Sequence, residues 1–208
     1  MSKSERFWNR QAGSFTDHEE KVRLDDNWDY KSILRYLGAN DTVLDYGCAT
    51  GIISNAIACK AGEVHGIDIS STMIEMAATK ARERNIKNVH FAHATIFDNK
   101  YQEESFDMVI AFRVLHMLED SPAVVRRINQ LLKPGGIFIS VTACMSSYKP
   151  FLGFVVSLLG KTGMIPEHIN FFKLPELQAL MTGQDFQIVE CEKMDDSVPH
   201  YCIVARKM

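Results

Sequence analysis

The stretch VLDYGCATGIISNAIA (43–58) places one carboxylate and two glycines where a buried strand runs into an apolar helix. Such a turn points backbone N–H groups at a ligand, and its glycines let the ligand approach closely. The spacing departs from the G-x-G-x-x-G pattern of dinucleotide-binding turns, because Ala49 replaces the second glycine and Gly51 comes one residue early. A fixed carboxylate at Asp45 would repel a pyrophosphate and attract an ammonium group. The turn therefore favours a ligand that carries an amine.

A second carboxylate, Asp68, lies near the end of the segment GEVHGIDIS (62–70), one helix further along the chain. It could accept both hydroxyl hydrogens of a ribose, as the acidic residue at this point of a nucleotide-binding fold does. It could also cap the following helix, although Ser70 or Ser71 could take that role. A ligand with an amine and a ribose but no pyrophosphate has the parts of S-adenosylmethionine (AdoMet).

The elements that must position these residues alternate between strand-like and helix-like runs from about 41 to 143, which indicates an α/β fold with a parallel sheet. The expected strands are TVLDYG (42–47), GEVHGIDI (62–69), NVHFAHA (88–94), SFDMVIAFRV (105–114) and GIFISVTA (136–143). The expected helices are 51–60, 70–85, with a capping box of Thr72 and Glu75, a run from Ser121 to about 131, and 174–183. The last runs, 185–194 and 200–208, predict an antiparallel hairpin.

Four segments together resemble the class I AdoMet-dependent methyltransferase family: VLDYGCATG, VHGIDIS, FDMVIAFRVLHMLED and LLKPGGIFIS. The resemblance runs from about 41 to 143 and covers more than half the chain. It implies a Rossmann-like doubly wound sheet of seven strands, mostly parallel, with helices on both faces. The last strand, near 200–206, would run antiparallel.

The resemblance also implies which residues bind AdoMet. The turn after the first strand would line the methionine part, Asp68 would hold the ribose hydroxyls, and Ile69 and Met73 would pack beside the ribose and adenine. Thr95 occupies the place of the acidic residue that often binds the adenine amino group, with Ile96 against the ring. The complete expected set is Asp45, Gly47, Cys48, Ala49, Gly51, Asp68, Ile69, Met73, Thr95, Ile96, Phe112 and Arg113.

Methyl transfer from a sulfonium is an in-line displacement that needs no protein nucleophile, so positioning and exclusion of water can carry much of the catalysis. An acceptor hydroxyl or protonated amine also needs a base, for which His116 is the first candidate. His116 could equally be a buried structural histidine. Arg113, expected between cofactor and substrate, could instead pair with a carboxylate for structural reasons.

The chain is expected to form a single methyltransferase domain of four parts. Residues 1–40 form an N-terminal helical lid and 41–143 the cofactor-binding core, while 174–208 form a closing helix and hairpin. Residues 144–173 are an apolar insertion, interpreted as a second lid over a small substrate, with a dimer interface as the alternative. The lid at 1–40 could also be a helix packed permanently on the sheet.

Composition excludes several classes of function. A formal net charge of -3 without clusters of Lys and Arg argues against a nucleic-acid partner. The five cysteines contain no CxxC pair, so neither a disulfide framework nor a metal site is expected. No signal sequence or membrane span is apparent. The expectation is a cytoplasmic monomer or homodimer acting on a small molecule. A nicotinamide-dependent oxidoreductase and a non-catalytic AdoMet-binding protein are the alternatives.

Overall fold

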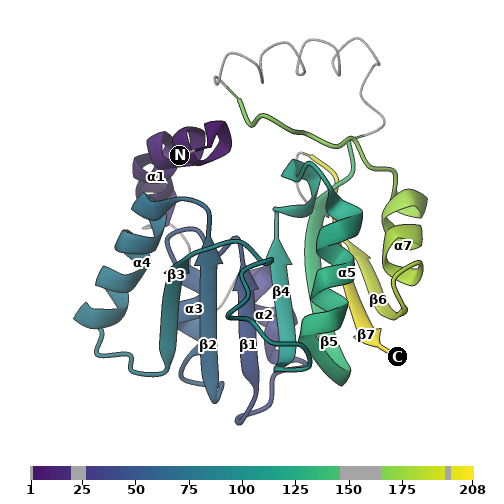
Figure 1. Ribbon diagram of the computed structural model, residues 1–208, viewed down its shortest axis with the longest axis horizontal. Helices are drawn as coiled ribbons and strands as arrows, with labels where there is room; N and C mark the ends of the chain where they lie inside the picture. Colours follow the sequence, from purple (N-terminus) through teal and green to yellow (C-terminus); the bar gives the residue numbers. More distant parts are fainter. Residues whose placement is uncertain (1, 20–26, 146–164, 195–197) are drawn as a thin grey trace.

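A computed structural model of the chain describes residues 2–19, 27–145, 165–194 and 198–208 (Figure 1). Its centre is a seven-stranded sheet with the strand order β3-β2-β1-β4-β5-β7-β6. The strands are β1 (Thr42–Tyr46), β2 (Glu63–Asp68), β3 (Val89–His93), β4 (Phe106–Phe112), β5 (Leu132–Ala143), β6 (Phe186–Lys193) and β7 (His200–Lys207). The first five strands are parallel, and β7 pairs antiparallel with both β5 and β6. The predicted fold class is confirmed.

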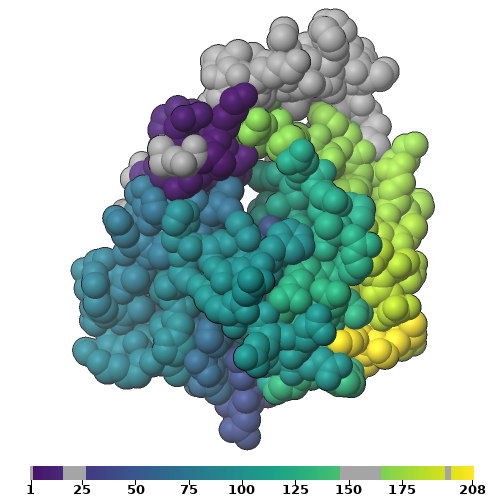
Figure 2. All heavy atoms as spheres, in the orientation of Figure 1, coloured from purple at the N-terminus to yellow at the C-terminus, as the bar shows by residue number. Residues whose placement is uncertain are grey.

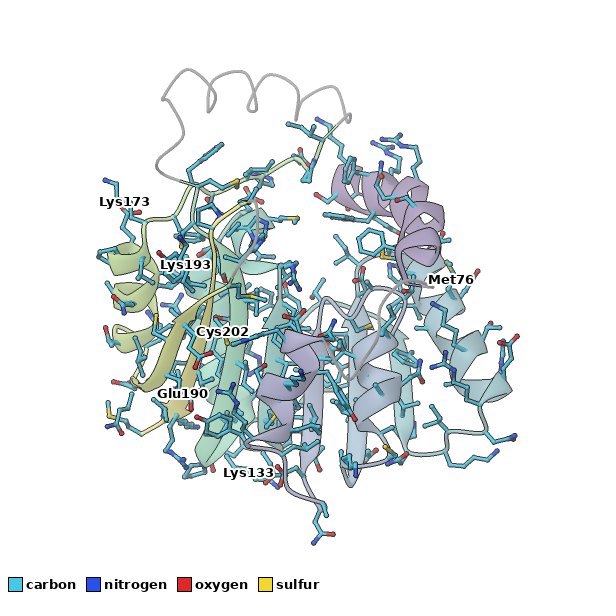
Figure 3. The ribbon with its side chains drawn as sticks, turned by 180° about the vertical axis from the view of Figure 1, so that it is seen from behind. Met76, Lys133, Lys173, Glu190, Lys193 and Cys202 are labelled. Carbon is cyan, nitrogen blue, oxygen red and sulfur yellow. The ribbon has the colours of Figure 1, made fainter. Side chains whose placement is uncertain are left out.

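Helices cover both faces of the sheet (Figure 1). They are α1 (Lys3–Glu19), α2 (Trp28–Leu34), α3 (Ile52–Ile57), α4 (Ser71–Glu83), the 3-10 turn η2 (Leu115–Met117), α5 (Ser121–Leu131) and α7 (Leu174–Thr182). Helices α5 and α7 pack on one face, while α2, α3 and part of α4 pack on the other, which Figure 3 shows from behind.

Alternation along the central strands divides the core into two layers. In β4, Val109 and Ala111 belong to the layer under α5, whereas Met108 and Ile110 belong to the layer under α2 and α3. All four side chains are fully buried. This is the pattern of a parallel strand covered on both faces, and it confirms the prediction from its continuous apolar sequence.

Helix starts follow local capping chemistry. Asp120 caps α5 by accepting a 2.9 Å hydrogen bond from the N–H of Ala123, and a proline lies in the first turn. Ser70 caps α4, because its Oγ accepts a hydrogen bond from the N–H of Met73 at 3.2 Å. The predicted capping box of Thr72 and Glu75 is therefore wrong. The serine just before the helix takes the cap, which leaves Thr72 inside the first turn.

The predicted closing hairpin is confirmed, because β6 and β7 pair antiparallel. Strand β7 lies between β5 and β6, so the last strand of the chain is internal to the sheet. Phe186 of β6 meets Phe138 of β5 across the core, with ring centroids 5.6 Å apart. Both rings are buried, so this contact joins the hairpin to the parallel part of the sheet.

The connection from β3 to β4, residues 94–105, contains turns but no helix. Phe97 in this connection is 52% exposed. Among the helices of the described ranges, none is long and apolar enough to cross a membrane. All five cysteines are free thiols.

Replacing Phe138 by Ala is expected to lower the free energy of unfolding by about 3–5 kcal/mol, because it removes a fully buried ring and its contact with Phe186. The matched control is Phe97→Ala, the same truncation at an exposed ring, which should change stability by less than about 0.5 kcal/mol. Urea unfolding monitored by circular dichroism measures both. Equal losses in the two variants would contradict the packing described.

Candidate functional site

The turn after β1 folds back onto β2. The N–H groups of Gly47 and Cys48 both donate to the carbonyl of Ile67, at 2.8 and 3.1 Å. Gly51 closes the turn by donating to the carbonyl of Cys48 at 2.9 Å and then caps α3. The cofactor turn expected from the sequence is therefore a compact loop at the carboxyl ends of β1 and β2, where α/β folds bind ligands.

Both glycines of this turn are required by the space around them. They adopt positive φ angles, 77° at Gly47 and 74° at Gly51. A Cβ at Gly47 would lie 2.8 Å from a methyl of Val114, and one at Gly51 would lie 2.7 Å from both Ala77 and Phe91. A side chain at either position would force the helices and strands around the turn apart.

Ala49 also adopts a left-handed conformation, with φ 48°. An L-residue with a Cβ is strained there by roughly 1–2 kcal/mol. The N–H of Ala49 donates to Asp68 at 3.1 Å, so this backbone conformation is held by the second carboxylate of the site.

Asp45 is a buried carboxylate, 4% exposed, at the end of β1. The hydroxyl of Ser54 donates to its Oδ2 at 2.5 Å. Burial raises the pKa of Asp45 to about 7, with Asp68 and Asp29 adding to the rise and the Ser54 hydrogen bond opposing it. A bound cation would favour the ionised form of this side chain, so the turn is prepared for a positively charged ligand.

Asp68 ends β2 beside the turn. Its two carboxylate oxygens accept backbone hydrogen bonds from Ala49 at 3.1 Å and Ser70 at 2.8 Å. Burial raises the pKa of Asp68, although these backbone donors act in the opposite direction. Each oxygen keeps a second lone pair, so the carboxylate can still accept hydroxyl hydrogens. Since Ser70 caps α4, Asp68 is not required for that role.

The segment after β4 brings together Arg113, Asp29 and His116. Arg113 has a φ of 58°, and its guanidinium forms an ion pair with Asp29, whose side chain is 8% exposed. This contact joins α2 to the end of β4, so the structural alternative for Arg113 is present. Within the described residues, Oδ1 of Asp29 has no hydrogen-bond partner. That atom is a buried acceptor beside the other two carboxylates.

His116 lies in η2 and is 6% exposed. Its Nδ1 is buried without a hydrogen-bond partner among the residues described, and its ring centroid is 6.4 Å from that of His200. Burial, together with the charges of His200 and Arg113, lowers the pKa of His116 to about 4. The imidazole is therefore neutral near pH 7, and its buried Nδ1 lacks a hydrogen-bond partner among the described residues.

The remaining predicted residues differ in how accessible they are. Met73 and Ile96 are 2% and 0% exposed, so both belong to the core. Thr95 is exposed, while Ile69 and Phe112 are half-buried. Cys48 is buried within the turn, and burial raises the pKa of its thiol.

Two segments form a roof over the carboxyl ends of the strands. Asn9 of α1 accepts hydrogen bonds from the Ser70 hydroxyl at 2.6 Å and the Thr72 N–H at 3.3 Å. Lys3 of α1 reaches Glu167 of the second segment, residues 165–173, with 3.9 Å between the charged atoms. Figure 2 shows an opening between α1 and these residues. The helix predicted as a lid thus lies above the site, and most of the predicted insertion, 146–164, lies outside the described residues.

Sequence reasoning missed several of these contributors. Asp29 lies among many charged residues of the N-terminal segment. Nothing in the neighbouring sequence indicates that this side chain is buried. Ser54 is the third residue of α3, and its hydroxyl donates to Asp45. The helical periodicity after the turn could have indicated that Ser54 faces Asp45. Asn9 and His200 come near the site only through long-range packing. Across the described part of the chain, no group of three or more His, Cys, Asp or Glu side chains is placed to hold a metal ion.

Comparison with known proteins gives the family. A family model described as "Methyltransferase domain" matches residues 37–189. The chain belongs to the class I AdoMet-dependent methyltransferase family. A ubiquinone biosynthesis O-methyltransferase from Shewanella sp. (strain ANA-3) is 27% identical over 147 residues, which cover 69% of this chain and 62% of the relative. The uncharacterized methyltransferase YcgJ of Bacillus subtilis (strain 168) is 27% identical over 155 residues, 74% of this chain and 60% of the relative.

Solved structures share the fold of this methyltransferase. The crystal structure of YcgJ from Bacillus subtilis covers 86% of this chain and 97% of its own, with a TM-score of 0.69 and 19% identity. The [4+2]-cyclase SpnF covers 90% of this chain and 84% of its own, with a TM-score of 0.71 and 17% identity. The chain matches just over 60% of the length of the first curated relatives, so their complete activities do not transfer to it directly.

The residues of the turn fit AdoMet, the cofactor of this family. Asp68 and Asp29 lie close enough to Asp45 to add to the rise of its pKa, although Asp29 is itself paired with Arg113. Such a cluster disfavours a pyrophosphate and suits a ligand that carries an ammonium and a sulfonium. The oxidoreductase alternative is therefore not supported.

Replacing Asp45 by Asn is expected to stabilise the free protein at pH 8 by roughly 1–4 kcal/mol, with little effect at pH 4. The folded pKa, about 7, lies above the unfolded value. Ionisation therefore costs folding stability as the pH rises from about 4 to 7. The same change should weaken AdoMet binding at pH 8, because the ammonium loses its anionic partner.

Thermal unfolding of parent and variant at each pH, with calorimetric titration of AdoMet, measures both effects of this substitution. Other titrating groups cancel in the difference between the two proteins. Glu75→Gln, at an exposed position on α4, is the control and should show no such pH-dependent gain. A difference in stability that stays constant between pH 4 and pH 8 would contradict the role of the buried carboxyl.

Proposed function

We propose that this protein transfers a methyl group from AdoMet to a small-molecule acceptor by in-line displacement, as a monomer or homodimer. The main support is the buried carboxylate Asp45 in a glycine turn at the carboxyl ends of the strands, with Asp68 beside it. AdoMet supplies an activated methyl group on a sulfonium, so positioning and water exclusion can carry much of the catalysis.

The proposed roles of the chain's residues follow their places in the structure. The turn and Asp45 hold the amino-acid end of the cofactor, and Asp68 accepts the ribose hydroxyls. Ile69 and Met73 pack beside the ribose and adenine, and Thr95 lies at the adenine edge with Ile96 behind it. Phe112 and Arg113 lie between cofactor and acceptor. The other turn residues in this proposal are Gly47, Cys48, Ala49 and Gly51.

A hydroxyl is the acceptor group that the site supports best. Its proton must be removed in or before the transition state, and the neutral His116 offers a buried nitrogen without a partner for that purpose. The similarity to proteins named O-methyltransferases agrees with this choice. The roof formed by α1 and residues 165–173 would exclude water and contact the acceptor, and its size favours a small molecule over a macromolecule.

The alternative function is AdoMet binding without methyl transfer. It is kept because the fold neighbour SpnF is named a cyclase, so this fold is compatible with other activities. Methyl transfer to any acceptor would decide against it. Binding of AdoMet without turnover on a broad acceptor panel would favour it.

Asp68→Ala is expected to weaken binding of AdoMet and of its demethylated product, S-adenosylhomocysteine, by about 1–3 kcal/mol, because the ribose hydroxyls lose their acceptor. Calorimetric titration measures this, with NADH as a ligand that should not bind. Glu75→Ala removes an exposed carboxylate from the neighbouring helix and is the control. Unchanged affinity in a folded Asp68→Ala protein would mean that the ribose lies elsewhere.

His116→Ala is expected to bind AdoMet almost normally but to slow methyl transfer to hydroxyl acceptors by about 10²-fold or more, the range for loss of a general base. Transfer of a radiolabelled methyl group to a panel of phenols and catechols is the assay. His90→Ala, at a side chain 55% exposed on β3 and outside the proposed methyl-transfer site, is the matched control and should keep its activity. A His116→Ala variant as active as the parent would remove this residue from catalysis.

A further inference from the structure

A second pocket lies at the opposite end of the sheet from the cofactor turn. It has a volume of about 430 Å³, in the size range of small-molecule sites. Its lining includes Thr42 and Phe106, the first residues of β1 and β4, so it opens at the amino ends of the strands. The cofactor turn closes the carboxyl end of β1, so the two sites are separated by the length of that strand.

This pocket exists because one connection lacks a helix. A parallel sheet is normally covered on both faces, and here residues 94–105 cross from β3 to β4 as turns. The face of β2 and β3 beneath them keeps His65 and His90 partly accessible, with side chains 28% and 55% exposed. Helix α5 contacts the second half of the connection, where Arg127 donates a hydrogen bond to the carbonyl of Tyr101 at 2.7 Å.

Four of the nine residues that line the pocket carry rings, and Thr42, Gln102 and Ser105 add polar groups. The ring of His65 meets Phe106 edge-on at 5.6 Å and lies 5.4 Å from the ring of His90. Tyr101 packs against Phe106 at 6.1 Å, and Ala92 completes the apolar surface. Flat rings arranged in this way favour stacked or edge-on contacts with an aromatic ligand.

The charge on the lining is positive. Lys100 lies with its ammonium 4.9 Å from the ring centre of Tyr101, and it makes no ion pair within the ranges that the structure describes. Burial lowers the pKa of His65, so this imidazole supplies surface rather than charge near pH 7. Glu63 does not line the pocket, and its Oε1 lies 3.2 and 3.1 Å from the Nε2 atoms of His65 and His90.

Three carboxylates near the pocket have cationic partners, whereas Asp98 accepts the backbone N–H of Lys100 at 3.1 Å and Glu63 contacts the two histidines. Glu103 pairs with Arg127, and Glu104 pairs with Lys207. Asp107 accepts two hydrogen bonds of 2.8 Å from Lys133. Lys100 is therefore the cation on this lining that is available to a ligand.

We propose that this pocket is a second ligand site, distinct from the methyl-transfer site, for a small aromatic carboxylate whose ring packs among His65, His90 and Phe106 and whose carboxylate faces Lys100. The ring of a benzoate-sized ligand fits the volume, and the charge of Lys100 complements its carboxylate. The site does not depend on which acceptor the enzyme methylates.

Benzoate is the probe, and benzamide is its neutral counterpart of the same shape. Imidazole resonances of His65 and His90, followed by NMR during titration of the full chain saturated with S-adenosylhomocysteine, report occupancy. We expect saturable shifts of both histidines with benzoate, binding of benzamide at least about 5-fold weaker, and no effect of inorganic phosphate. Shifts caused equally by phosphate would show an anion site without aromatic selectivity and would overturn the proposal.

Lys100→Gln is expected to reduce benzoate affinity to that of benzamide while leaving benzamide unchanged. Lys87→Gln, at an exposed lysine between α4 and β3, is the control and should keep the preference for benzoate. Because Lys100 is exposed, the variant should fold normally. An unchanged benzoate preference in Lys100→Gln, or shifts at His116 instead of His65 and His90, would overturn the assignment and place the ligand elsewhere.

Discussion

Burial of the Asp45 carboxylate at the end of β1 is the constraint on which the rest of the site depends. A carboxyl that is 4% exposed favours its protonated form, and its pKa rises to about 7. The surrounding backbone can stay compact because Gly47 and Gly51 take left-handed conformations where a Cβ would lie within 2.8 Å of neighbouring side chains. The fold therefore accepts an unfavourable charge where a cationic ligand can stabilise it, a common pattern at functional sites.

The same turn connects Asp45, at the end of β1, with Asp68, at the end of β2. Ala49 is held in a strained conformation while its N–H donates to Asp68, and Ser70 donates to the other oxygen of Asp68. Ser70 in turn caps α4 and donates its hydroxyl to Asn9 of α1. A continuous set of hydrogen bonds thus runs from the turn to the roof. Asp68 and α1 are therefore connected through neighbouring hydrogen-bonded groups.

The two ends of the sheet have different chemistry for topological reasons. The carboxyl ends of β1 and β2 carry Asp45 and Asp68, and Arg113 and His116 follow β4, while α1 lies above α4 at the same end of the sheet (Figure 1). At the amino ends, the helix-free connection between β3 and β4 leaves an aromatic and basic hollow. The two ends of one fold thus differ in composition, which is consistent with the proposal of two separate sites.

The family and the main elements could be predicted from the sequence because their signals are local. Strand β1, the glycine turn and Asp68 are contiguous motifs, and the buried strand β4 follows from a continuous apolar run. The cap of α4 was misassigned because Thr72 and Ser70 both have suitable chemistry, and only the observed backbone conformation distinguishes them. The sequence by itself determined the class of fold, the turn and its two carboxylates.

The tertiary structure decided which distant groups act on the site. The pairing of Asp29 with Arg113, the proximity of His200 to His116 and the contact of Asn9 with Ser70 join residues that are 84, 84 and 61 positions apart. Whether His116 is charged also depends on burial, which is a property of the packed molecule. Periodicity and motif spacing describe only neighbours along the chain, whereas pKa values and hydrogen-bond partners depend on everything that packing brings within a few ångströms.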